Sequence, residues 1–209
     1  MKRIFIFISL LLIISIIAVG CGETTAEDTD SALEVNEETD SKGSGEDNVT
    51  DNLGKRSNPV PLDEWVEFQD TYYESIESFD GIEGTYKLRI TEVERSDVAL
   101  EKLIEENQFN EPAPEGYEWI IIHLEIEMLE GDEDTPYTVV PFINVMASTG
   151  NEVSQDDYAT LDGNEFGHVD LFPGGTHSGR VTKYVPEEDE SLLVYEVGFD
   201  TGIYFSITE

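Results

Sequence analysis

The side chains in this sequence that could carry out catalysis form no recognisable constellation, and its 47 carboxylates are too many for any pair of them to be informative. The chain has one cysteine, Cys21, and three histidines, at positions 123, 168 and 177. The histidines lack the tight ligand spacing of a transition-metal site, so we expect none. No Gly-x-Ser-x-Gly motif marks a strained serine nucleophile. The sequence therefore favours a protein that is not an enzyme.

Acidic side chains gather in two predicted loops and are candidates for binding Ca²⁺. One group includes Asp132 and Asp134, and the other includes Asp156, Asp157 and Asp162. Carboxylate oxygens on irregular loops suit this hard cation. The spacing does not match an EF-hand, however, and a chain with 47 acidic residues produces such groups by chance. Solvated loops without a metal are the alternative interpretation.

Residues 1–20 predict a signal peptide. Lys2 and Arg3 precede an apolar run from Ile4 to Val19, which only Ser9 and Ser15 interrupt. The run is shorter than the roughly 20 residues that span a bilayer comfortably, and its flanks are those of a secretory signal. A short membrane helix, or an ordinary signal peptide that happens to end at a cysteine, is the alternative.

The last residues of this segment, Ala18-Val19-Gly20-Cys21, resemble the lipobox of bacterial lipoproteins. The resemblance implies that the Cys21 thiol receives a diacylglycerol and becomes the mature N-terminus. Two acyl chains make a stable anchor, which would hold the protein on the outer face of the cell membrane. Because Cys21 is the only cysteine, its lipidation would leave no thiol for catalysis and no intrachain disulfide.

The chain is strongly acidic, with 11 Lys and Arg against 47 Asp and Glu and a formal net charge of −36. Such a chain is repelled by nucleic acids and by anionic membrane surfaces, so we expect no nucleic-acid partner. After Cys21, residues 22–57 are rich in Glu, Asp, Thr and Ser and poor in large apolar side chains. This composition predicts that residues 21–57 form a disordered acidic linker. An acidic binding tail is the alternative.

Residues 58–209 are long enough for one domain with its own core. The clearest strand runs from Tyr117 to Leu129, where alternate residues from Ile120 to Met128 form an apolar face. The opposite set begins with Trp119 and becomes progressively polar, so we expect a central strand of an antiparallel sheet with one solvated face. Over residues 97–108 the spacing of the apolar residues changes from that of a strand to that of a helix. This predicts one helix of about three turns with Asp97 as its N-cap.

Shorter runs predict further strands around this central one. They cover residues 65–68, 71–78, 85–91, 137–148, 168–172, 176–185, 191–197 and 203–207. Val93 breaks the alternation of its strand, which indicates a bulge or the end of the strand, and Pro141 indicates an edge or a bulge. The acidic run 187–190 is interpreted as a hairpin turn. Many short strands with one helix indicate a mainly β protein with an antiparallel β-sandwich.

Several motifs carry a family resemblance over residues 58–207. They are Pro112-x-x-x-Gly116-Tyr117-Glu118-Trp119, Tyr86-x-Leu88-x-Ile90-Thr91-x-Val93 and Phe172-Pro173-Gly174-Gly175. Together they resemble a family of unknown function found in Gram-positive lipoproteins and secreted antigens. The resemblance implies a telokin-like, immunoglobulin-like sandwich and supplies no catalytic residues. Ser96 departs from it, since a glycine is expected at the turn into the helix.

These patterns favour an extracytoplasmic, lipid-anchored, immunoglobulin-like module that binds an envelope protein or a cell-wall component. Because aromatic side chains dominate interface hot spots, we predict an interaction patch at Tyr117, Trp119 and His123. The alternative is a lipoprotein that captures a small ligand or a cation, Ca²⁺ foremost, as an accessory to a transporter. Apart from the diacylglycerol on Cys21, we expect no cofactor.

The lipid anchor can be tested by replacing Cys21 with serine. A hydroxyl cannot take the place of the thiol as the lipid acceptor, so Cys21→Ser should abolish incorporation of labelled fatty acid. The variant should then remain unprocessed or leave the membrane fraction. Normal lipid labelling of Cys21→Ser in whole cells would refute the lipobox interpretation.

Overall fold

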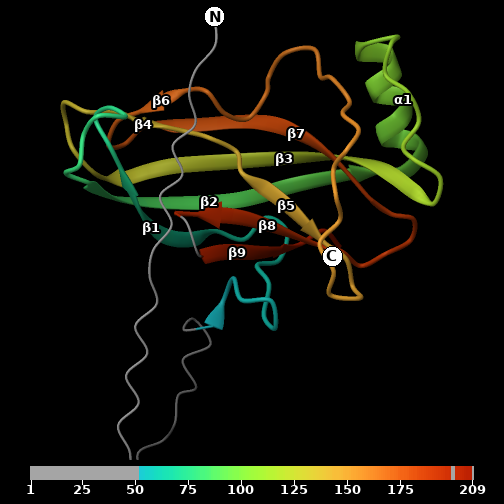
Figure 1. The fold of residues 1–209 in the computed structure, drawn as a ribbon, viewed down its shortest axis with the longest axis horizontal. Helices are drawn as coiled ribbons and strands as arrows, with labels where there is room; N and C mark the ends of the chain where they lie inside the picture. The colour runs from blue at the N-terminus through green and yellow to red at the C-terminus, as the bar shows by residue number, and fades with distance from the viewer. Residues whose placement is uncertain (1–51, 199–200, 209) are drawn as a thin grey trace, which may run out of the picture. The chain divides into compact units, whose positions relative to one another are not determined.

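The computed structural model describes residues 52–198 and 201–208. The predicted signal peptide, the lipid-attachment residue Cys21 and most of the acidic linker lie outside the described residues. Within them the chain folds into antiparallel strands and one helix (Figure 1). This confirms a mainly β sandwich with one short helix, while the immunoglobulin-like classification stays a prediction.

The larger sheet is built around strand β3 (Tyr117–Glu130). Its order is β1-β2-β3-β7, and all its pairings are antiparallel. The other strands are β1 (Val66–Tyr72), β2 (Ile82–Arg95) and β7 (Thr176–Pro186). Strand β3 is therefore hydrogen-bonded along both edges, as predicted for a central strand.

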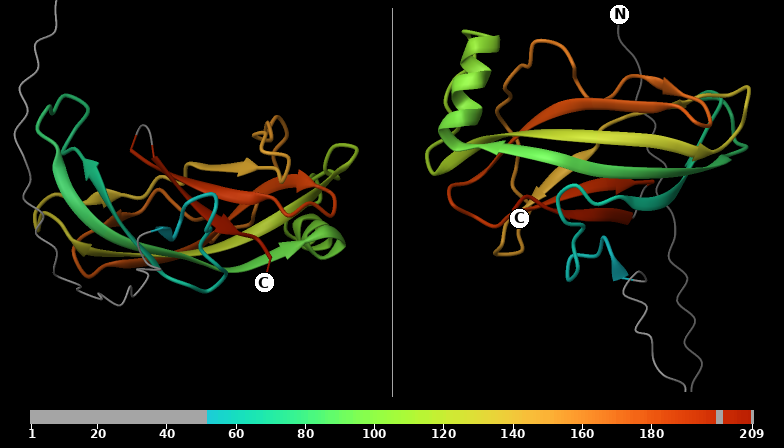
Figure 2. Two further views of the ribbon diagram at one scale, coloured as in Figure 1. Left: turned by 90° about the horizontal axis from the view of Figure 1, so that it is seen from below. Right: turned by 180° about the vertical axis from the view of Figure 1, so that it is seen from behind.

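A second sheet has the order β5-β8-β9, with antiparallel pairings (Figures 1 and 2). Its strands are β5 (Ile143–Met146), β8 (Leu192–Val197) and β9 (Thr201–Ser206). A two-stranded pair is formed by β4 (Tyr137–Thr138) and β6 (Asp170–Leu171). Helix α1 (Ser96–Glu106) follows β2 directly and lies against β2 and β3.

One apolar core joins the two main sheets. The Phe68 ring of β1 lies 5.4 Å from the Tyr86 ring of β2 and 5.9 Å from the Tyr195 ring of β8, measured between centroids. Val60, before β1, bridges to Phe205 of β9. Contacts of this kind bury apolar area from both sheets, and such burial is the main driving force for folding.

The two faces of β3 differ as the sequence predicts. Its inner residues are buried at every second position, from Ile120 to Met128. On the opposite face Trp119 and Ile121 are also buried, because α1 and the β5–β6 loop cover this end of the strand. Further along, the side chains of His123 and Glu127 are 25% and 28% exposed.

Several predicted details are confirmed or corrected. The register between β2 and β3 shifts between Ile90 and Glu92, which confirms the bulge. The predicted strand 137–148 is instead divided around Pro141 into β4 and β5, which pair with different strands. The predicted strand 71–78 is wrong, since β1 ends at Tyr72. The run 187–190 is not a hairpin turn, because β7 and β8 belong to different sheets.

Part of the predicted linker belongs to the folded domain. Leu53 packs against the core, and the Gly54 carbonyl accepts a 2.8 Å hydrogen bond from the Tyr204 amide of β9. Lys55 and Asn58 form an isolated bridge. The sequence boundary at residue 57 therefore falls inside the domain. Across the described ranges, no helix combines the length and the apolar character that crossing a bilayer demands.

Two buried tyrosines in this core differ in whether their hydroxyl groups are hydrogen-bonded. The Tyr86 hydroxyl is buried without a hydrogen-bond partner among the described residues. The Tyr184 hydroxyl instead donates to the Ser154 carbonyl at 2.6 Å and accepts from the Asp156 amide at 2.8 Å. An unpaired buried hydroxyl is costly, whereas a paired one contributes to stability.

We therefore expect Tyr86→Phe to leave the free energy of unfolding unchanged or to raise it by up to about 1 kcal/mol. Tyr184→Phe should lower it by about 1–2 kcal/mol, since it removes one partner of two hydrogen bonds. Urea unfolding monitored by circular dichroism measures both. Equal destabilisation by the two variants would contradict this assignment of the hydroxyls.

Candidate functional site

A cleft of about 690 Å³ opens where β3 begins, beside the first turn of α1. One wall is the start of the helix, another is the Pro112–Gly116 segment, and a third is the turn after β7. Its apolar lining consists of Leu100, Pro112, Ala113, Pro114, Tyr117 and Trp119. Its acidic lining consists of Asp97, Glu115, Glu118, Glu187 and Glu188. The lining residues include no Lys, Arg or His.

The sequence of the Pro112–Gly116 segment explains this wall. The prolines favour an extended chain in this segment, after α1 has ended at Glu106. Gly116 has a φ of 83°, a left-handed conformation that a glycine adopts without strain. The turn closes with a 2.9 Å hydrogen bond from the Tyr117 amide to the Pro114 carbonyl, and the Glu187 amide donates to the Gly116 carbonyl. Segments more than 70 residues apart are thereby held together.

Glu118 is the one acidic lining residue that is neutralised by a neighbour. Its carboxylate lies 2.6 Å from the Arg95 guanidinium and accepts hydrogen bonds from the Ser96 hydroxyl and the Glu188 amide. Burial raises the pKa of the Glu118 carboxyl, but the bonds from Ser96 and Arg95 outweigh it, so the net pKa is lowered. Glu118 therefore remains ionised and fixes the start of the helix.

Ser96 adopts a φ of 57°, in the left-handed region that favours glycine. The family resemblance predicts a glycine at this turn, and the backbone of Ser96 has the positive φ that a glycine adopts easily. The hydroxyl compensates by its hydrogen bond to Glu118. The predicted N-cap at Asp97 is wrong: Arg95 occupies the cap position, its side chain makes no capping hydrogen bond to the helix, and Asp97 lies in the first turn.

The predicted interaction patch is corrected by the structure. Trp119 is only 4% exposed, and its indole nitrogen donates to the Glu111 carbonyl at 2.9 Å. Its ring packs edge-on against Tyr184 at 5.5 Å. Tyr117 and His123 lie six positions apart on β3, or roughly 20 Å at the rise of a strand. Trp119 is thus a core residue with an edge in the cleft, and the three residues form no common exposed patch.

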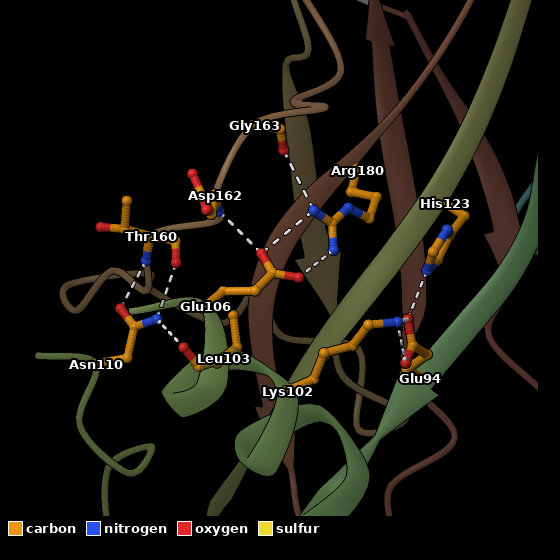
Figure 3. A network of polar contacts seen from close by, with 10 residues as sticks. All are labelled: Glu94, Lys102, Leu103, Glu106, Asn110, His123, Thr160, Asp162, Gly163 and Arg180. Carbon is orange, nitrogen blue, oxygen red and sulfur yellow. Dashed lines mark hydrogen bonds and ion pairs between the residues drawn. The ribbon is translucent and has the colours of Figure 1, made fainter. Parts of the chain in front are cut away.

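A network of polar contacts holds α1, and so the helical wall of the cleft, against the sheet (Figure 3). Glu94 of β2 binds the Lys102 ammonium at 2.8 Å and the Nε2 atom of His123 at 2.6 Å. Burial raises the pKa of the Glu94 carboxyl, but the hydrogen bonds from Lys102 and His123 lower it further than burial raises it. His123 thus contacts a helix-anchoring carboxylate.

The other end of α1 is fixed by a second group in this network (Figure 3). The Arg180 guanidinium of β7 binds both carboxylate oxygens of Glu106, at 2.5 and 3.2 Å, and also donates to the Gly163 carbonyl. The Asp162 amide donates to Glu106 at 2.9 Å. Asn110 continues the link, because its amide joins the Leu103 and Thr160 carbonyls.

Sequence reasoning missed these ion pairs, although the composition contained a signal for them. Basic residues are scarce after residue 58, and most of them find carboxylate partners. The paired ones are Lys87, Arg89, Arg95, Lys102 and Arg180. In a chain this acidic, each basic side chain has many candidate partners, so the sequence indicates pairing but does not identify the partner.

The predicted calcium ligands do not converge. Asp132 and Asp134 follow the C-terminal end of β3, whereas the Asp156 amide binds Tyr184, which faces Trp119 at the other end. Asp157 is exposed, and Asp162 lies at the α1 network. Within residues 52–198 and 201–208, no three His, Cys, Asp or Glu side chains are placed to hold a metal ion. The calcium interpretation gains no support from this geometry.

Asp132 instead has a local structural contact. Its Oδ1 atom accepts hydrogen bonds from the amides of Asp134 and Thr135, at 2.9 and 2.8 Å. These bonds lower the pKa of the Asp132 carboxyl. The remaining histidines are apart from the cleft: His177 stacks on Phe166 at 5.4 Å, and His168 lies in the preceding loop.

Comparison with known proteins adds little to this geometry. No protein-family model and no curated protein matches the chain. A candidate lipoprotein of Bacillus subtilis subsp. subtilis, YcdA, is 8% identical with a TM-score of 0.42, and the match covers 58% of this chain and 36% of that one. A conserved hypothetical protein of Bacillus anthracis is 11% identical with a TM-score of 0.28, over 66% and 96% of the two chains. This chain thus matches about a third of YcdA, and likenesses this remote carry no argument about function.

The Glu106–Arg180 pair predicts how stability depends on pH. The hydrogen bond from Arg180 is the main cause that lowers the pKa of the Glu106 carboxyl from its usual 4.5. Folding therefore favours the ionised carboxylate. The stabilisation of the fold by this carboxylate is fully present above the usual carboxyl pKa, and it is lost as the pH falls through the lowered pKa.

We expect Glu106→Gln to lower the free energy of unfolding by about 1–2 kcal/mol near neutral pH. The difference from the unsubstituted protein should shrink as the pH falls below the usual carboxyl range. Urea unfolding across a pH series measures this, with the exposed neighbour Glu105→Gln as the matched control. A difference that stays constant with pH would contradict the assigned role of the pair.

Proposed function

We propose that this protein is a lipid-anchored module on the outer face of the cell membrane that acts by binding. The Ala18–Cys21 motif supports the anchor, and the signal peptide before it supports export. The partner that we propose is an envelope protein or a cell-wall component with cationic groups. Binding of nucleic acid is disfavoured by the net charge of −36.

The observation that carries this proposal is the composition of the cleft. An apolar floor that includes Leu100 and Tyr117 is bordered by carboxylates that include Glu115 and Glu187. Apolar contact area supplies affinity, and complementary charge supplies specificity and a faster encounter. A partner segment with an apolar side chain between basic ones would satisfy both parts of this surface.

The lining of the cleft favours binding over catalysis. Ser96 is its one hydroxyl of the serine type, and that hydroxyl is hydrogen-bonded to Glu118, which Arg95 already neutralises. A serine nucleophile needs a free general base beside it, and among these lining residues Glu118 is not free to act as one. We therefore propose no catalytic activity for this site.

Capture of a small cationic ligand is the second candidate function. The volume of about 690 Å³ lies within the usual range of small-molecule pockets. The same carboxylates would then meet an ammonium or guanidinium group of the ligand. This candidate function corresponds to the lipoprotein that captures a small ligand, and the ligand would be an organic cation instead of Ca²⁺.

Crosslinking in intact envelopes tests the proposed binding at the cleft. The double variant Glu115→Gln with Glu187→Gln removes two exposed charges from the rim and leaves the core intact. We expect the yield of crosslinked partner to fall about fivefold, since weakening two charge contacts by a fraction of a kcal/mol each has this effect.

The matched control is Glu101→Gln with Glu105→Gln, which removes the same charge from an exposed part of α1 outside the cleft lining. It should crosslink as the unsubstituted protein does. Equal losses in the two double variants would show that net charge alone, and not the cleft, determines binding.

A further inference from the structure

The loop between β1 and β2 exposes large apolar side chains to water. Ile76 and Phe79 are 104% and 96% exposed, and Tyr73 is 48% exposed. The loop lies at the end of the sheet away from α1 in each view (Figures 1 and 2). Single exposed apolar residues are common, but several on one short loop are typical of an interaction surface.

A groove of about 500 Å³ lies between this loop and strand β4. Tyr73 and Ile76 line it from the loop, and Pro136 and Tyr137 line it from the other side. Its lining is mainly apolar, in contrast to the cleft beside α1. Tyr73 and Ile76 thus belong both to the exposed loop and to this groove, which we term the distal groove. Phe79 lies on the same loop outside the lining.

The floor of the distal groove is firmly held. The Tyr72 hydroxyl donates to the Thr135 carbonyl at 3.1 Å and accepts from the Asp132 amide at 3.0 Å. The rings of Tyr72 and Tyr137 meet edge-on at 5.8 Å, and both residues are buried. A pre-formed floor lowers the entropic cost of binding, because few of its side chains must be ordered by a partner.

Acidic residues lie on both sides of the distal groove, and the residues that line it include no Lys or Arg. Glu74, Glu77 and Asp80 lie on the loop, and Glu133 and Asp134 lie on the segment opposite. In sequence, no Lys or Arg occurs between Arg56 and Lys87, nor between Lys102 and Arg180. An occupant must therefore combine apolar side chains for the groove with cationic ones for its rim.

We propose that the distal groove docks an extended protein segment in which apolar and basic side chains alternate. Alternation places the apolar side chains on the groove face and the basic ones toward the acidic rim. This site is distinct from the cleft beside α1, because the two have no lining residue in common. Figure 1 shows α1 at one end of β3 and the loop between β1 and β2 at the other.

A bilayer is the less suitable occupant for the same loop. Insertion of Ile76 and Phe79 would carry Glu77 and Asp80 into the interfacial region. Carboxylates are repelled by anionic leaflets and are costly to desolvate. A protein segment with basic residues removes both penalties, because it supplies the opposite charge.

The test uses the full-length protein in nanodiscs of zwitterionic lipid, with empty discs as background. Three short fluorescent peptides are compared by anisotropy: alternating Leu and Lys, alternating Ser and Lys, and alternating Leu and Glu. The Leu-Lys peptide should bind at least about tenfold more tightly than either of the others. Tyr73→Ser with Ile76→Ser, which changes two lining residues, should weaken that binding by about tenfold or more.

Phe109→Ser with Tyr158→Ser is the matched control, since these residues are 81% and 82% exposed and do not line the distal groove. It should leave binding unchanged. The proposal fails if the Ser-Lys peptide binds as tightly as Leu-Lys, or if the control loses as much binding as the groove variant.

Two further outcomes separate this proposal from others. If Glu115→Gln with Glu187→Gln abolishes peptide binding while the groove variant retains it, the cleft is the site and the distal groove is overturned. The membrane alternative is examined with Phe79→Trp in discs that contain anionic brominated lipid. Quenching of the added tryptophan would show insertion into lipid and would also overturn the proposal, whereas unchanged emission supports it.

Discussion

Strand β3 is the element on which the rest of this structure depends. Its inner side chains from Ile120 to Met128 are all buried, and hydrogen bonds to β2 and β7 occupy both of its edges. Because the side-chain period of a strand is two, a shift of its register by one residue would turn this apolar set toward water. The strand therefore fixes the positions of its neighbours, and its first residues line the cleft.

Electrostatics adds a second constraint, since a chain with net charge −36 repels itself when it is compact. The few basic residues lie where they relieve that repulsion. Arg89 pairs with Glu125 and Asp63 and lies 4.5 Å from the Trp65 ring, on the solvated face of the sheet. Arg180 and Lys102 fix α1, the only helix within the described residues. With so many carboxylates left without cations, both candidate binding surfaces are suited to a positively charged partner.

Much of the fold could be predicted from the sequence, because periodicity reports burial directly. The alternation in β3, the bulge near Val93 and the closing strands follow from side-chain pattern alone. The site could not be predicted in this way. Trp119 has a residue type common in interfaces, but whether it lies in the core depends on Tyr184, which is distant in sequence and adjacent in the sheet. The acidic groups likewise gave no indication that Asp132 and Asp156 lie at opposite ends of β3.

Native-state hydrogen exchange tests the central role of β3 most directly. Amides that open only on global unfolding exchange slowest, and elements held by a few surface contacts exchange by local opening. The structure predicts that the amides of residues 120–128 are the most protected in the domain, with an opening free energy equal to that of global unfolding. Those of α1 should exchange faster, and those of the β1–β2 loop fastest. Protection of β3 that is no greater than that of α1 would contradict this account.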